Sequence, residues 1–147
     1  MDVGGTYTFQ APADKVWDVL LDPENLASCM PGCERLEPLG DGKYRASLSV
    51  GVGSIQGKYE ATITVSDQVP TRSYKLTVEG TGSSGFVRGE AVVSLAEQDG
   101  STVVTVQGQG QIGGTIARVG QRLIGSVNKM MMDRFFTCLQ RSAEQGA

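Results

Sequence analysis

The sequence predicts an α+β domain in which a curved antiparallel sheet wraps a long C-terminal helix. Two patterns carry this prediction. Up to Gly114 the chain consists mostly of short segments in which apolar and polar residues alternate, as in half-buried strands. Between residues 115 and 141 the apolar residues recur with a helical period instead. Burying about eight apolar side chains on this helix is worth roughly 2 kcal/mol each, so we expect the sheet to cover it.

Two short helices are expected between the first strand and the rest of the sheet. The first strand is predicted over residues 3–10 by its alternation. Apolar residues then follow at helical spacing over residues 13–20. Asp22 is suited to an N-cap and Pro23 to the first helical position, which predicts a second helix over residues 24–30.

Six further strands follow, because turn residues divide the chain before the long helix into alternating segments. These turns are expected at residues 41–42, 69–71, 80–85, 99–100 and 113–114. The order of strand, two short helices, six strands and one long helix predicts seven strands in a single domain spanning residues 1–147. Glycine accounts for 20 of the residues and is scattered through the strands, which suggests bends in a strongly curved sheet.

The composition excludes several classes of enzyme. The chain has no histidine, which removes the commonest general base and every histidine-containing metal site. Cys29 and Cys33 are too few ligands for a metal, so we expect neither a metal nor a cofactor. Three cysteines in a chain too large to need disulfides fit a reducing compartment, so the expected location is the cytoplasm, with no disulfide. No apolar run is long enough to predict a transmembrane helix.

The long helix is the basic element of an acidic protein. The formal net charge is −3, yet residues 115–141 hold five basic residues against one acid. Arg118, Arg122 and Lys129 fall opposite the apolar strip, where they are either an ordinary solvated face or a docking surface for an acidic partner or anionic lipid. Nucleic-acid binding is not expected, because the chain is acidic overall and its aromatic residues are not interleaved with the basic ones.

Several motifs in the same order resemble CoxG, a family of carbon monoxide dehydrogenase subunits within the START-like or SRPBCC superfamily. The motifs are Val16-Trp17-Asp18-Val19-Leu20, Asp22-Pro23, Cys29-Met30-Pro31-Gly32-Cys33-Glu34, Gly85-Phe86 with Gly89, Gly113-Gly114, Gly120, Arg122-Leu123-Ile124 and Asp133-Arg134-Phe135-Phe136. The resemblance implies a helix-grip fold of the START/Bet v 1 kind with an internal hydrophobic cavity. It also implies an accessory role beside a molybdenum-containing carbon monoxide dehydrogenase or related hydroxylase, in assembly, membrane recruitment or electron coupling through a quinone. We expect no membrane anchor in this chain, so that peripheral membrane contact at the inner face would run through a partner.

With that resemblance, we expect an apolar quinone- or lipid-like ligand between the long helix and the sheet. The predicted cavity residues are Leu26, Met30, Pro31, Phe86, Ile116, Val119, Gly120, Leu123, Val127 and Met131. Gly120 would remove a side chain on the inner side of the helix, and methionines can repack around different ligands. The alternative is that the apolar strip simply fills the groove as ordinary core. Likewise, Pro31-Gly32 is either a gate over the cavity mouth or a plain turn from helix to strand.

Two other functions remain open from the sequence. A START-like enzyme of the polyketide cyclase or dehydratase type would need an acid–base group, and no spacing singles out a pair. The only suppliers are Tyr7, Tyr44, Tyr59, Tyr74, Glu60, Glu79 and Arg88. An assembly factor that docks an enzyme through the basic face would need no ligand at all. The glycine-serine segment over residues 80–85 lacks the features of a phosphate loop and is expected to be a hairpin.

Overall fold

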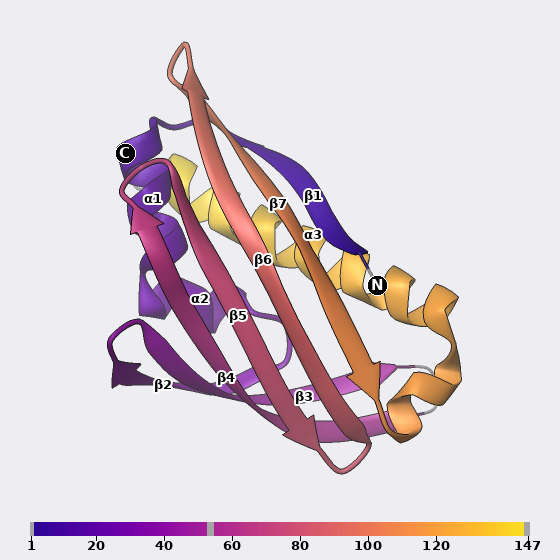
Figure 1. Cartoon of the computed structure of the whole chain (residues 1–147). Helices are drawn as coiled ribbons and strands as arrows, with labels where there is room; N and C mark the ends of the chain where they lie inside the picture. The colour runs from indigo at the N-terminus through magenta and orange to yellow at the C-terminus, as the bar shows by residue number, and fades with distance from the viewer. Residues whose placement is uncertain (1, 53–54, 146–147) are drawn as a thin grey trace.

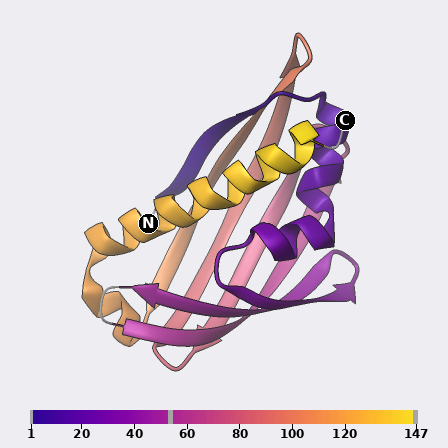
Figure 2. The same cartoon turned by 180° about the vertical axis from the view of Figure 1, so that it is seen from behind.

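The structure is a computed structural model that describes residues 2–52 and 55–145. Seven antiparallel strands form one sheet in the order β1-β7-β6-β5-β4-β3-β2, and the long helix crosses its inner face (Figures 1 and 2). The strands are β1 Asp2–Phe9, β2 Cys33–Gly40, β3 Lys43–Val52, β4 Ile55–Val69, β5 Ser73–Gly82, β6 Gly85–Gln98 and β7 Ser101–Gly113. The helices are α1 Ala13–Leu21, α2 Pro23–Cys29, the 3₁₀ turn η1 Thr115–Val119 and α3 Gln121–Gln145. The predicted fold class and order of elements are confirmed.

Local turn chemistry explains why the sheet is a meander after β2. Asp41 and Gly42 have φ values of 52° and 74°, and Asp99 and Gly100 have 54° and 81°. Two successive residues with positive φ form the tight turn that matches the twist of a hairpin. Each of these Asp-Gly pairs therefore joins two neighbouring strands, as the sequence predicts.

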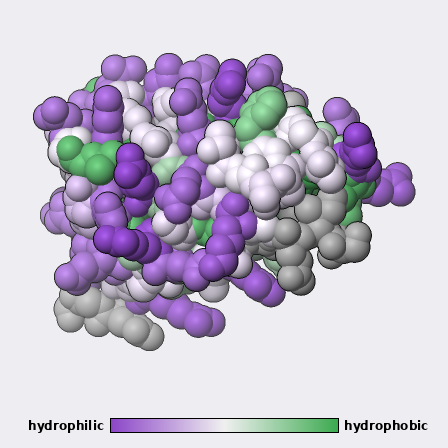
Figure 3. Space-filling model, turned by 90° about the horizontal axis from the view of Figure 1, so that it is seen from below, coloured by the Kyte–Doolittle hydropathy of each residue, from purple (hydrophilic) through white to green (hydrophobic). Residues whose placement is uncertain are grey.

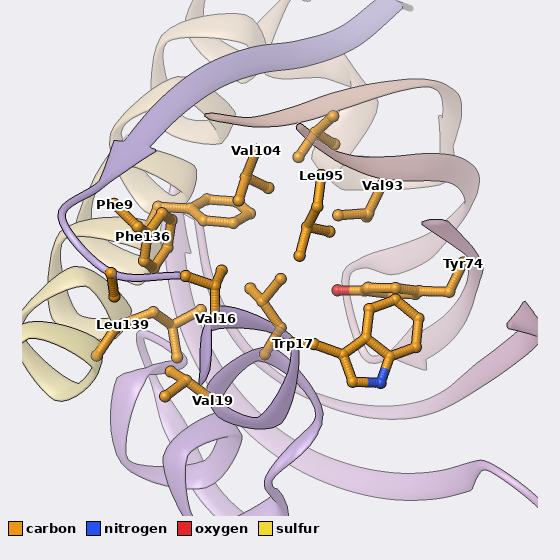
Figure 4. Packing of buried hydrophobic residues seen from close by; sticks show 14 of the residues in the cluster. Phe9, Val16, Trp17, Val19, Tyr74, Val93, Leu95, Val104, Phe136 and Leu139 are labelled. Atoms are coloured by element: carbon orange, nitrogen blue, oxygen red, sulfur yellow. The ribbon is translucent and has the colours of Figure 1, made fainter. Parts of the chain in front are cut away.

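The main hydrophobic core lies where α1 and the C-terminal half of α3 meet the inner face of β1, β5, β6 and β7. Figure 4 shows Phe9, Phe136 and Leu139 meeting side chains of α1 there, while Trp17 lies at the other side of the cluster. The Trp17 ring packs edge-on against Tyr74, with ring centroids 5.6 Å apart. The helix α1 therefore closes one end of the sheet.

The prediction of one continuous helix over residues 115–141 is wrong in one respect. The segment begins as the 3₁₀ turn η1, and Gly120, with φ of 93°, separates that turn from α3. Gly120 is thus an exposed residue at the break between η1 and α3. It does not lie on the inner side of a continuous helix, so it opens no space there. Because α3 begins anew after this break, the side of the helix that faces the sheet is not the predicted apolar strip. Two residues of that strip, Leu123 and Met130, are 37% and 44% exposed. The residues of α3 that are buried are Ile124, Phe136, Leu139 and Ala143.

The expectation that no disulfide forms is also wrong. Cys29, at the end of α2, is bonded to Cys138 on α3, and Cys33 is the free cysteine. The two partners lie 109 residues apart in sequence, with Cα atoms 5.4 Å apart. The argument for a reducing compartment relied on unpaired cysteines and loses that support.

Candidate functional site

Most of the buried apolar residues among the described ones belong to two separate clusters. The larger cluster is the core around α1 and the second half of α3. The smaller cluster surrounds the η1 end of the sheet, with Tyr59 and Ile116 buried. Leu48, Ile112, Val119 and Val127 pack against this smaller cluster and are only partly buried. The smaller cluster is thus a satellite of the main core.

Between the two clusters, several inner-face positions of β5, β6 and β7 carry no side chain or only a methyl group, beside Leu76, Val78 and Val87 on the same face. We call this stretch the glycine-lined face; its residues are Gly80, Gly89, Ala91, Gly108 and Gly110. Gly89 of β6 pairs with Gly110 of β7, Ala91 pairs with Gly108, and Gly80 lies on the adjacent strand β5. A Cβ atom added at Gly89 would have within 4 Å only backbone atoms of β7. One added at Gly110 would have only a carbonyl oxygen of β6 and the Val3 side chain. No described atom of α3 lies within 4 Å of a Cβ atom placed at these two positions.

The position of α3 agrees with this geometry. The backbone of α3 runs closest to β1 and β3, which lie toward the two sides of the curved sheet, and stays farther from the central strands β4, β5 and β6. In Figure 2, α3 crosses the inner face as a diagonal bar, with α1 and α2 at one end. A helix held at the sides of a curved sheet leaves the middle to side chains or to a ligand, and the glycine-lined face supplies few side chains.

The predicted cavity residues of the long helix fall into two groups. Ile116 is buried, and Val119, Val127 and Met131 are partly buried, so these four lie toward the interior. Gly120 and Leu123 are exposed, and their predicted inward position is wrong because the helical phase restarts after η1.

Phe86 also lies elsewhere than predicted. It is 37% exposed and lies on the outer face of the sheet, because the alternation of β6 turns Val87 inward and Phe86 outward. The guanidinium carbon of Arg88 lies 5.3 Å from the centroid of the Phe86 ring. Phe86 therefore does not face the space between α3 and the sheet.

The segment after α2 forms a turn from helix to strand. Leu26, Met30 and Pro31 are all partly buried. Gly32 has φ of 76°, and its carbonyl accepts a hydrogen bond of 2.8 Å from the Ser49 amide. The turn is thus fixed to β3 on one side and, through the adjacent Cys29 disulfide, to α3 on the other.

A polar contact joins α3 to the first strand. The Tyr7 hydroxyl donates to the Asp133 carboxylate at 2.9 Å, and the Lys129 ammonium donates to the other carboxylate oxygen at 3.1 Å. Burial and the Asp133 carboxylate raise the pKa of Tyr7 to about 12. The bonds from Lys129 and Tyr7 lower the pKa of Asp133. The Tyr7 ring also stacks on Phe136, with centroids 4.2 Å apart. These contacts anchor α3 beside β1.

The predicted basic face is on the surface. Arg118, Arg122 and Lys129 are exposed, and Lys129 is the member that pairs with an acid, Asp133. Arg134, on the same helix, is also exposed. Seen from below, polar and charged side chains cover much of the molecule, and apolar side chains show in separate patches (Figure 3).

A groove lies on the outer face of the sheet. This groove of about 640 Å³ is bordered by charged residues of β2 to β6. They are Arg35, Glu37, Arg45, Glu60, Glu79 and Arg88. Glu60 accepts a hydrogen bond of 2.8 Å from Ser47, and Arg35 pairs with Glu37 at 2.5 Å. Three of the candidate acid–base residues for a cyclase-type reaction, Glu60, Glu79 and Arg88, thus lie outside the space beneath α3.

Two kinds of feature are absent from the described part of the chain. Within residues 2–52 and 55–145, no group of three or more acidic or cysteine side chains is placed to hold a metal ion. Over the same residues, no helix combines the length and the apolar character needed to cross a membrane.

Several solved structures share this geometry. A crystal structure of a conserved protein from Geobacillus kaustophilus is 36% identical, with a TM-score of 0.94, over 99% of this chain and 96% of that one. The Zhui aromatase/cyclase from Streptomyces sp. R1128 is 20% identical, with a TM-score of 0.70, over 99% and 94%. A START superfamily protein from Mycobacterium smegmatis is 14% identical, with a TM-score of 0.68, over 99% of both chains. The last two similarities concern the fold, which is START-like.

The curated proteins contain no match to this sequence. The family model for CoxG, a subunit of carbon monoxide dehydrogenase, matches residues 5–144, which is nearly the whole described chain. The protein therefore belongs to the CoxG family of carbon monoxide dehydrogenase subunits.

Proposed function

We propose that this protein binds an apolar small molecule, quinone- or lipid-like, between α3 and the inner face of the sheet. We further propose that it does so as an accessory protein of a molybdenum-containing carbon monoxide dehydrogenase or a related hydroxylase. The observation that carries the ligand site is the glycine-lined face between two separate apolar clusters. Membership of the family and the START-like fold support hydrophobic-ligand binding as the class of function.

The surroundings of this face suit an apolar ligand. Val119 and Val127, on the helical side, and Leu48 and Ile112, on the sheet side, are each only partly buried. Side chains of this kind gain free energy when a hydrocarbon covers their remaining surface, at about 25 cal/mol per Å². Ligand pockets are typically lined by apolar side chains with a few polar groups that fix orientation.

A non-catalytic role fits the distribution of charge. Glu60, Glu79 and Arg88 border the outer groove, so the charged candidates for acid–base chemistry are separated from the ligand by the sheet itself. Docking of an acidic partner would use Arg118 and Arg122, which are exposed and, unlike Lys129, have no acid beside them among the described residues.

The ligand site can be tested with two tryptophan substitutions on the same helix. Val127 packs against the smaller cluster, whereas Leu123, one turn earlier, is 37% exposed. Val127→Trp should fill the space and reduce binding of a fluorescent apolar probe, N-phenyl-1-naphthylamine, by at least tenfold. Leu123→Trp is the matched control and should bind as the wild-type protein does. A wild-type protein that binds neither this probe nor any extractable quinone or lipid would overturn the proposed function.

Docking is tested separately. Arg118→Glu combined with Arg122→Glu should abolish capture of the partner hydroxylase in a pull-down while leaving binding of the apolar probe unchanged. Capture that persists at wild-type strength in this variant would exclude the basic face as the docking surface.

A further inference from the structure

Two buried hydroxyl groups meet inside the smaller apolar cluster. Tyr59, on the inner face of β4, is 5% exposed, and Ser84, in the turn between β5 and β6, is 8% exposed. Their oxygen atoms are hydrogen-bonded to each other. We call these two groups the hydroxyl pair. Ile116 completes the buried part of their surroundings, and its neighbours are apolar.

The hydroxyl pair is held in place from several sides. The Tyr59 ring lies against Gly82, where an added Cβ atom would be 2.9 Å from a ring carbon. The Ser84 carbonyl accepts a hydrogen bond of 2.8 Å from the Ile116 amide, which ties the turn to η1. A side chain at Gly57 would come 2.8 Å from the Ser84 hydroxyl oxygen. Glycine at positions 57 and 82 therefore leaves the room in which the two hydroxyls meet.

The hydroxyl pair has one more donor than it can use internally. Two hydroxyls bring two O–H donors, and the bond between them uses one. Among the described residues, neither hydroxyl has a second hydrogen-bond partner. Among the residues that the structure describes, one O–H donor thus has no acceptor, and an unsatisfied donor in an apolar environment is disfavoured. The acceptor that would complete the pair is an oxygen with free lone pairs.

We propose that the hydroxyl pair donates a hydrogen bond to a carbonyl oxygen of the ligand. This inference rests on the proposed apolar-ligand site and specifies the chemistry at one end of it. The ligand carries a carbonyl group near η1, and its hydrocarbon part extends over the glycine-lined face toward the larger cluster. A quinone ring and a lipid ester both offer such an oxygen, whereas a pure hydrocarbon does not.

The test compares probes that differ in their carbonyl groups. Duroquinone and durene share four ring methyl groups, and only duroquinone has carbonyl oxygens. Methyl laurate and dodecane form the corresponding lipid pair. Binding is measured by equilibrium dialysis with the wild-type protein and with a variant carrying Tyr59→Phe and Ser84→Ala together. Both hydroxyls must be removed, since either one alone could still donate to the ligand. Removing both partners also leaves no buried donor unsatisfied, so the variant should fold.

Loss of one hydrogen bond should weaken duroquinone binding about three- to tenfold, with durene binding unchanged. Tyr74→Phe, which removes a buried tyrosine hydroxyl from the larger cluster, is the matched control. This substitution should leave the affinities for both duroquinone and durene unchanged. A loss confined to methyl laurate would also support the hydroxyl pair as the donor and would identify a lipid as the source of the carbonyl. Equal affinity of wild type and variant for both carbonyl probes would overturn the inference while leaving the ligand site intact. If no probe binds the wild-type protein, the proposed function itself fails.

Discussion

The disulfide between Cys29 and Cys138 gives a prediction whose size follows from the structure. Reducing this bond, in a protein that carries Cys33→Ser to prevent exchange, removes a covalent link across 109 residues. The chain-entropy relation assigns a loop of that length about 5 kcal/mol of stabilisation at 25 °C. Measured values fall below the relation, so we expect the free energy of unfolding to decrease by about 3 to 5 kcal/mol. That is a large part of the roughly 5 to 15 kcal/mol that stabilises a typical domain.

The assay is urea unfolding of the oxidised and reduced proteins, followed by circular dichroism and by the fluorescence of Trp17. The reduced protein should have a lower midpoint, together with a steeper dependence on urea because its unfolded chain expands further. In the denatured wild-type protein, thiol titration should find one reactive thiol before reduction, that of Cys33, and three afterwards. Three thiols before reduction, or identical unfolding midpoints, would refute the reasoning.

Three further predictions concern stability. Leu139→Ala should lower the free energy of unfolding in urea by about 2 to 5 kcal/mol, because Leu139 is 0% exposed, whereas Leu123→Ala at an exposed position should lower it by less than about 1 kcal/mol. Equal decreases would contradict the orientation of α3. Gly32→Ala should destabilise more than Gly40→Ala, because both have positive φ but a Cβ at Gly32 would lie 2.3 Å from a β3 carbonyl oxygen; similar melting temperatures would argue against that close approach. The pKa of Tyr7, raised from 10 to about 12, implies that its share of stability is present below pH 10 and is lost as the pH rises toward 12. An absorbance titration at 295 nm should therefore show a tyrosine that ionises near pH 12 in the wild type and is missing in a Tyr7→Phe variant, whereas the change in absorbance near pH 10 should be the same in both proteins.

The order and type of the elements could be predicted from the sequence because they depend on local patterns. Alternation identified the strands, and the Asp-Gly pairs identified two hairpins through a backbone conformation that few other residues adopt readily. The start of α2 was equally local: the Asp22 side chain accepts a hydrogen bond from the Glu24 amide, with Pro23 at the first helical position. These features involve residues within a few positions of each other.

The inward side of the long helix could not be predicted in the same way. Each residue's orientation around the helix axis depends on where the helix begins. Because α3 begins only after the break at Gly120, Leu123 and Met130 face the surface. The methionines remain adaptable side chains, but the predicted residues of this segment that lie toward the interior are Ile116, Val119, Val127 and Met131. A glycine inside a helical pattern signals either a helix interior or a break, and only the backbone conformation distinguishes the two.

The sequence by itself determined the fold class, the seven strands and the family, since these rest on periodicity, turn residues and ordered motifs. Only the tertiary structure decided which distant residues meet. It paired Cys29 with Cys138 across 109 residues, brought the Tyr59 and Ser84 hydroxyls together, and aligned glycines from neighbouring strands on one face. Such contacts depend on strand register and helix placement, and both are fixed by the packing of the whole domain rather than by any local pattern.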